Sequence, residues 1–200
     1  RMLERALRRS ALPISFTGGF HPLPRIQIAL ALPLGATAHG EWMDLEFSES
    51  LTPERLQETL QPLLPDEIRL LAVEEVPVSS RSLSQEIQAA VWTFGLAVET
   101  GSAPDWPAAV EAITAADQLI WNDTDKKGRP RQRDCRSSLL SLLPLSPPDD
   151  TWIQLRLEAA VDDMGRSLRP LQIQHWLSEQ IGAPLRLQDL CRDELRLAQC

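Results

Sequence analysis

The feature that most constrains the fold is an alternation between two kinds of apolar pattern. Residues 26–32, 41–47 and 152–161 carry apolar side chains at every second position, and in the last stretch Leu155 and Leu157 share one side. Other stretches repeat with a helical period. A period of two predicts a half-buried strand, whereas a period near 3.6 predicts an amphipathic helix. The chain is therefore expected to be an α+β protein with antiparallel sheets covered by helices.

These stretches follow a fixed order along the chain. Over residues 1–76 the order is helix, strand, strand, helix, strand, and over residues 89–200 the same order follows an initial strand. This is the βαββαβ succession of ferredoxin-like units. We therefore predict two tandem ferredoxin-like units, at 1–76 and 89–200, joined by a polar linker at 77–88. The first unit lacks its N-terminal strand, because the chain begins with Arg1 and is expected to be a fragment of a longer protein.

Local signals set the expected boundaries. Thr52 fits an N-cap with Pro53 at the first helical position, another helix begins near Asp105, and Gly182 ends a third helix that starts at Arg169. A first helix is expected at 1–10 and an irregular insertion at 139–150. The expected strands are 26–32, 41–47, 68–76, 91–99, 118–125, 152–161 and 185–197.

The composition is that of an ordinary globular protein. The chain has 200 residues, 43% of them hydrophobic and 24% charged. No apolar run approaches the roughly 20 residues of a transmembrane helix, and no signal peptide is recognisable. Cys135, Cys191 and Cys200 are too few and too widely spaced for a disulfide framework or for a zinc or iron–sulfur motif. We therefore expect a cytoplasmic protein with no membrane partner and no cofactor in this segment.

Charge is distributed unevenly along the chain. The net charge is −8, but residues 1–40 carry five arginines against one glutamate, and 41–75 carry ten acids against two arginines. Residues 126–136 then carry six basic side chains against one aspartate. Such an uneven distribution of charge predicts one surface that binds an anion and another that binds a different partner. The competing interpretation is a set of solvated faces and hairpin tips.

The segment 17–25 combines features of a binding loop. Gly18 and Gly19 allow backbone N–H groups to approach an anion, and the prolines that follow stiffen the chain. His21 and Arg25 would then point outward at a fixed spacing that suits phosphate or carboxylate. In the alternative interpretation the loop is only rigid, with Phe20 filling the core.

The basic segment 126–136 is predicted to be a hairpin tip, with Gly128 at its turn. Its cations either remain in water or contact a phosphate backbone. Trp42, Trp152 and Trp121 could stack on bases of single-stranded RNA, as aromatics on ferredoxin-like sheets do. The alternative that we favour is that these tryptophans pack between the two units.

No catalytic group is predicted. His21, His39 and His175 have no metal-ligand partner at helical or short-loop spacing. Asp44 and Glu46 share one face of a strand, but many acids surround them, which favours a solvated surface. Catalysis by His21 would need an acid or base partner that the sequence does not provide.

Three segments carry a family resemblance. They are RALRRSALPISFTGGFHPLPRIQIALALPLGATAHGEWMDLEF at 5–47, NDTDKKGRPRQRDCR at 122–136 and RSLRPLQIQHWL at 166–177. Together they resemble the radical SAM-linked domain, which occurs at the C-terminus of radical SAM proteins of the cobalamin-binding-domain type or is encoded beside them. The form is that of cyanobacterial fusions. The Gly-Phe-His-Pro-x-Pro-Arg core is the specific part, and the resemblance covers nearly the whole chain.

The resemblance implies that the parent protein is a radical SAM enzyme whose upstream barrel binds a [4Fe–4S] cluster and S-adenosylmethionine. This segment lacks the three closely spaced cysteines of such a barrel, so no cluster or S-adenosylmethionine ligand is assigned to it. We predict a non-catalytic domain that recognises substrate, with RNA as the candidate, through a basic surface. The alternative is a scaffolding module that docks the radical SAM domain of the same polypeptide or a partner protein. The candidate anion-binding residues are Arg5, Arg8, Arg9, Gly18, Gly19, Phe20, His21, Arg25, Lys126, Lys127, Arg129, Arg131 and Arg133.

Overall fold

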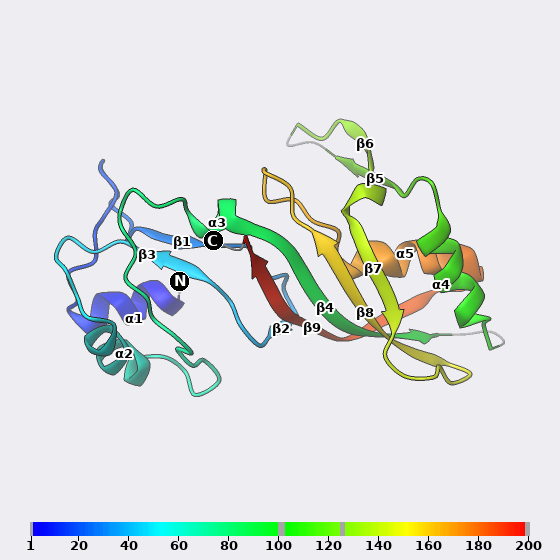
Figure 1. The fold of residues 1–200 in the computed structure, drawn as a ribbon, viewed down its shortest axis with the longest axis horizontal. Helices are drawn as coiled ribbons and strands as arrows, with labels where there is room; N and C mark the ends of the chain where they lie inside the picture. The colour runs from blue at the N-terminus through cyan, green and yellow to red at the C-terminus, as the bar shows by residue number, and fades with distance from the viewer. Residues whose placement is uncertain (1, 100–102, 125–126, 199–200) are drawn as a thin grey trace. The chain divides into compact units, whose positions relative to one another are not determined.

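The computed structural model describes residues 2–99, 103–124 and 127–198 and confirms a mixed α+β protein (Figure 1). It divides into two compact units: unit 1 holds residues 1–29 and 42–84, and unit 2 holds residues 30–41 and 85–200. The helices are α1 (Met2–Ser10), α2 (Pro53–Leu60), α3 (Leu83–Glu86), α4 (Trp106–Ala115) and α5 (Pro170–Ile181), with 3-10 turns at Gln61–Leu63 and Arg136–Ser138. The strands are β1 (Ile26–Ile28), β2 (Thr37–Ala38), β3 (Met43–Leu45), β4 (Ile87–Val98), β5 (Ile120–Thr124), β6 (Pro130–Asp134), β7 (Leu139–Pro144), β8 (Trp152–Ala160) and β9 (Leu185–Leu197).

Unit 1 is held together by two short helices and a two-stranded sheet. The helix α2 begins as its sequence predicts, since the Thr52 side chain accepts a hydrogen bond from the Arg55 backbone N–H. The strands β1 and β3 pair antiparallel, with Gln27 opposite Asp44. The buried core of this unit comprises Ala6, Leu7, Leu12, Ile14, Leu56, Leu60 and Leu64. Helices and loops therefore supply most of this core.

The strand predicted at 68–76 does not form. The Gln61 side chain instead accepts a hydrogen bond from the Leu70 N–H and donates one to the Ile68 carbonyl, so these two backbone groups are satisfied without a partner strand. The strand predicted at 26–32 is also shorter than expected. Ile28 is 56% exposed and Ala29 is buried, so the apolar alternation ends at Ile28.

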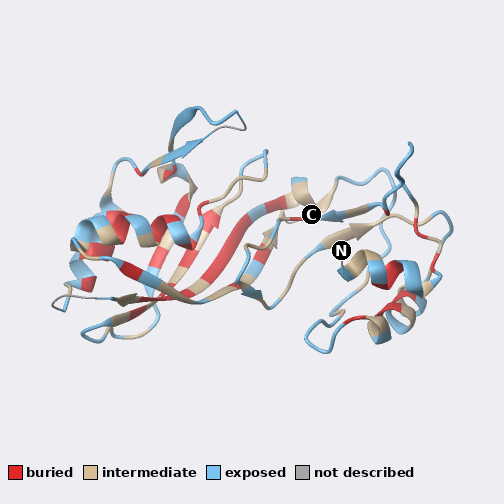
Figure 2. Cartoon of the chain, turned by 180° about the vertical axis from the view of Figure 1, so that it is seen from behind, coloured by how far each residue is buried: buried red, intermediate tan, exposed pale blue. Residues whose placement is uncertain are grey.

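Unit 2 is built on a five-stranded sheet in the order β2-β9-β4-β8-β7. Among its four long strands, each neighbouring pair is antiparallel. On β8 the alternation predicted from the sequence is complete: Ile153, Leu155, Leu157 and Ala159 are all fully buried. The helices α4 and α5 lie on one face of this sheet, and the buried residues run along β4 and β8 (Figures 1 and 2).

Two predictions for this part of the chain were wrong or differ from the structure. The segment predicted as an irregular insertion contains β7, which pairs with β8. The division into 1–76, 77–88 and 89–200 also differs from the observed one, because residues 30–41 belong to unit 2 and their strand β2 runs parallel to β9. The two tandem ferredoxin-like units are not confirmed, since unit 1 contains only the β1–β3 pair among its described strands.

Candidate functional site

The arginines of α1 lie on the surface of unit 1. Arg5, Arg8 and Arg9 are all exposed, while Ala6 and Leu7 on the same helix are buried. The Arg8 guanidinium lies 5.4 Å from the centre of the Phe16 ring, a cation–π contact. Arg5 and Arg9 line an open groove of about 390 Å³ together with the segment 62–65. The helix thus presents three cations to solvent.

The glycine-rich loop of unit 1 is exposed rather than plugged into the core. Phe20 is 101% exposed and His21 is exposed as well, so Phe20 does not fill the core. Gly19 adopts a φ of 108°, which other residues rarely adopt, and a side chain at Gly18 would meet no atom within 4 Å. Arg25, in contrast, pairs with Glu46 at 3.1 Å. Its charge is therefore already compensated within unit 1.

The basic segment of unit 2 forms the predicted hairpin. The strands β5 and β6 pair over their whole length, with Asp123 opposite Arg131 and Trp121 opposite Arg133. The side chains of both strands are almost all exposed, including Arg131, and so are Lys127 and Arg129 in the connection. Lys126 lies outside the described residues.

The base of this hairpin is fixed by a carboxylate. The backbone N–H groups of Arg136 and Leu119 donate hydrogen bonds of 2.9 and 3.0 Å to Asp134 Oδ1. These two bonds, the one from Arg136 first, hold the pKa of Asp134 below its usual range. The ionised Asp134 thereby ties the end of β6 to the segment before β5.

Two of the tryptophans considered for base stacking pack inside unit 2. Trp121 makes edge-on contacts with His175 and Trp176, at ring-centre distances of 5.3 and 6.2 Å. Trp152 covers Gly95, where an added Cβ would lie 2.8 Å from the indole nitrogen. Trp42 in unit 1 is 38% exposed. Stacking on Trp121 or Trp152 would first require their present packing to change.

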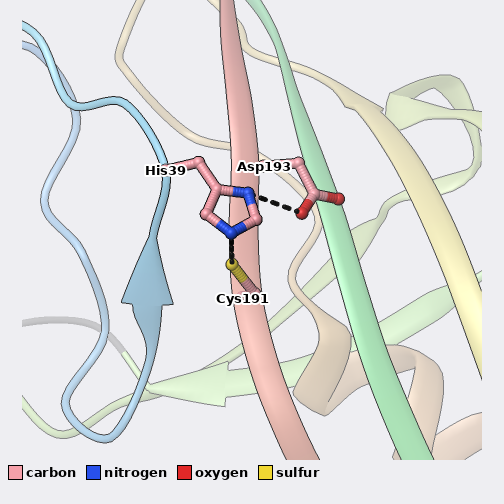
Figure 3. Close-up of side chains that lie close together, drawn as sticks. All are labelled: His39, Cys191 and Asp193. Carbon is pink, nitrogen blue, oxygen red and sulfur yellow. Dashed lines mark hydrogen bonds and ion pairs between the residues drawn. The ribbon is translucent and has the colours of Figure 1, made fainter. Parts of the chain in front are cut away.

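Three side chains of unit 2 lie close together although the sequence did not predict that they would meet (Figure 3). His39 Nε2 lies 3.9 Å from the Sγ of Cys191, and His39 Nδ1 lies 3.5 Å from an oxygen of Asp193. Cys191 and Asp193 are two positions apart on β9, a spacing that places side chains on one face of a regular strand. That spacing was the available signal, but His39 comes from a distant segment that only the β2–β9 pairing brings near.

A buried ion pair holds that distant segment to the sheet. Arg192 is fully buried and donates a hydrogen bond of 2.8 Å to Glu41 and one of 2.7 Å to the Leu30 carbonyl. Its guanidinium also lies 5.1 Å from the centre of the Trp92 ring. A buried charge must be paired and hydrogen-bonded to be tolerated. Arg192 therefore anchors both ends of the segment 30–41.

Within the described residues, no helix is both long and apolar enough to cross a bilayer. The fold and these surfaces define an α+β protein with a basic hairpin attached to a mostly antiparallel sheet. The chain belongs to the bacterial family described as "Uncharacterized protein conserved in bacteria (DUF2344)", whose model matches residues 1–170.

A comparison with solved structures bears on the fold. A solved structure titled "Crystal Structure of a Cbf5-Nop10-Gar1 Complex" resembles the chain with a TM-score of 0.50 at 12% identity. The match covers 86% of this chain, which spans only 41% of that one. At such an identity the likeness shows the fold alone. No curated protein matches the chain.

Proposed function

We propose that this chain is a non-catalytic recognition domain of a radical SAM protein and that it binds RNA phosphates through the β5–β6 hairpin. The observation that carries the proposal is the exposure of the basic residues of this hairpin in an otherwise acidic chain. Phosphate oxygens are the usual targets of exposed arginine and lysine in nucleic-acid binding, because their contacts release counterions and need no base sequence.

The arrangement of the hairpin supports this role. Its strands expose side chains on both faces, so most of the hairpin contributes little to a hydrophobic core. Trp121 and the carboxylate of Asp134 fasten its base to the rest of unit 2. A hairpin fixed at its base and charged along its length can follow a phosphate backbone without disturbing the sheet.

The arginines of α1 offer a second anion-binding surface in unit 1. Arg5 and Arg9 border the groove described above, and both residues are exposed. Arg25 is a weaker candidate, because Glu46 compensates its charge. Arg5, Arg8 and Arg9 are therefore the unit 1 residues that we assign to phosphate binding.

The proposal also includes a fold for unit 2 and a neighbouring domain in the parent protein. The strand order β9-β4-β8-β7 in unit 2, with α4 and α5 as crossovers, fits one ferredoxin-like unit with a hairpin inserted after α4 and β2 added at its edge. The sequence resemblance supports a place beside a radical SAM barrel. The [4Fe–4S] cluster and S-adenosylmethionine would bind in that other domain, and this chain would position the substrate.

Fluorescence anisotropy with labelled bulk tRNA tests the proposal. We expect binding that weakens steeply as salt rises, and a loss of about tenfold or more when Lys127, Arg129 and Arg131 are all replaced by alanine. A matched variant replaces Arg55, Arg69 and Arg81, which are exposed in unit 1 and change the net charge equally. Equal losses in the two variants, or no binding at low salt, would overturn the proposal.

A second candidate function is protein docking through unit 1. Apolar side chains are exposed along its C-terminal segment, where Leu71 is 71%, Val76 58% and Val78 90% exposed. Acidic residues flank them at Glu74 and Glu75. Cross-linking of the full-length parent protein tests this: links from Glu74 or Glu75 to another domain would support docking, and their absence would argue against it.

A further inference from the structure

We infer that His39, Cys191 and Asp193 form a binding site for a zinc ion. One ligand atom from each residue lies within 4.8 Å of the other two (Figure 3). All three residues belong to unit 2. The inference is independent of RNA binding, because it rests on a different part of that unit.

The spacing is close to what a zinc ion requires. Zinc binds sulfur at about 2.3 Å and imidazole nitrogen at about 2.0–2.1 Å in a tetrahedral arrangement, which separates the two ligand atoms by about 3.6 Å. His39 Nε2 and Cys191 Sγ are 3.9 Å apart. Because His39 now faces Asp193 with Nδ1 and Cys191 with Nε2, its ring must turn to offer one nitrogen to an ion shared with both. The His39 side chain is 74% exposed, so this turn does not disturb the core.

The backbone holds the three ligands in position. The His39 N–H donates a hydrogen bond of 3.1 Å to the Arg192 carbonyl, between the two other ligands on β9. Thr37 and Ala38 pair directly with Cys191 and Arg192. The buried Arg192 side chain then fixes the segment that carries His39. With the backbone held in this way on β9 and directly after β2, only side chains have to move to bind an ion.

A second layer of contacts orients the carboxylate. Thr93 Oγ1 donates a hydrogen bond of 2.6 Å to Asp193 Oδ2, and the other oxygen, Oδ1, faces His39. Partners of this kind orient metal ligands and tune their affinity. Thr93 is the register partner of both Cys191 and Arg156, which places it on the partly exposed face of the sheet. An ion can therefore reach the site from solvent.

The donor set selects the class of metal. One sulfur, one nitrogen and one oxygen suit zinc or a similar transition metal, whereas calcium and magnesium prefer oxygen alone. Three protein ligands leave a fourth position for water. Binding converts the Cys191 thiol to a thiolate and releases its proton, so affinity should rise with pH.

Titration of the whole chain with Co²⁺ and then Zn²⁺ tests the inference. We expect one equivalent of Co²⁺ to give a thiolate-to-cobalt charge-transfer band, which one equivalent of Zn²⁺ abolishes. Cys191→Ser should remove the band, and His39→Gln should weaken zinc binding at least tenfold. Thr93→Val should weaken it by about 10-fold or more while leaving the band in place at saturation. Circular dichroism confirms that each variant is folded.

Two matched variants serve as controls. His175→Gln alters an exposed histidine that also faces a carboxylate, Glu179 at 3.4 Å, and Cys200→Ser removes another thiol. Both should bind as the unaltered chain does. The inference is overturned if no cobalt–thiolate band appears, or if the band survives Cys191→Ser. It is also overturned if the chain binds no metal but His39 speeds the alkylation of Cys191. The three residues would then form a reactive cysteine rather than a metal site.

Discussion

Unit 1 and unit 2 contain similar apolar alternation, but only unit 2 converts it into an extended sheet. In unit 1, β1 and β3 are each three residues long and Ile28 remains 56% exposed. In unit 2, β8 is nine residues long, pairs on both sides and buries every second side chain completely. The comparison teaches that a period of two becomes a long strand where partner strands satisfy both edges of the backbone.

The largest expected effect contrasts the ion pairs of the two units. Glu41→Gln leaves the fully buried Arg192 without its carboxylate, and we expect the free energy of unfolding of unit 2 to fall by about 3 kcal/mol. Glu46→Gln removes the partner of Arg25, whose side chain is 51% exposed, and should cost less than about 1 kcal/mol. Urea denaturation followed by circular dichroism measures both. Equal losses would contradict the contrast between a buried and an exposed pair.

An intermediate effect is expected where a side chain is added at glycine. Gly95→Ala places a Cβ 2.8 Å from the Trp152 indole, which must move, and we expect a loss of about 1–2 kcal/mol with a shift in tryptophan fluorescence. Gly18→Ala in unit 1 meets no atom within 4 Å and should change stability by less than about 0.5 kcal/mol. Thermal unfolding of the two variants measures both changes in stability. A neutral Gly95→Ala would show that the packing of Trp152 on β4 is loose.

The smallest expected effect is a difference in pH dependence between the hairpin base and the sheet of unit 2. The folded pKa of Asp134 is lowered from its ordinary value of 3.8, first by the hydrogen bond from the Arg136 N–H. A lowered pKa stabilises the hairpin base above that ordinary value, and the contribution is lost as pH falls through the folded pKa. NMR should show the amide signals of Leu119 and Arg136 shifting below pH 3.8 before the sheet unfolds. In Asp134→Asn this titration should be absent.

Much of the local structure was predictable. Thr52 and Asp105 cap their helices through their own side chains, and Gly182 ends α5 with a φ of 71°. Such signals act over a few residues, so they are readable without a tertiary structure. The hairpin of β5 and β6 was predictable for the same reason, since Gly128 and the polar residues around it favour a turn.

The errors arose where distant residues decide the structure. The segment 68–76 is apolar enough for a strand, but the Gln61 side chain binds two of its backbone groups, and no described strand pairs with it. The segment 139–150 was predicted to be an irregular insertion, yet β8 pairs with its first half. Pairing between strands depends on which edges are free, and no local window of sequence contains that information.

The sequence by itself determined the α+β class, the caps of the helices, the inward face of β8 and the basic character of the hairpin. Each of these depends on neighbours within a few positions. Only the tertiary structure decided that residues 30–41 join the second unit and that His39 meets Cys191 and Asp193. The physical reason is that Arg192, once buried, requires Glu41 as its partner, and this pairing brings together residues far apart in the chain.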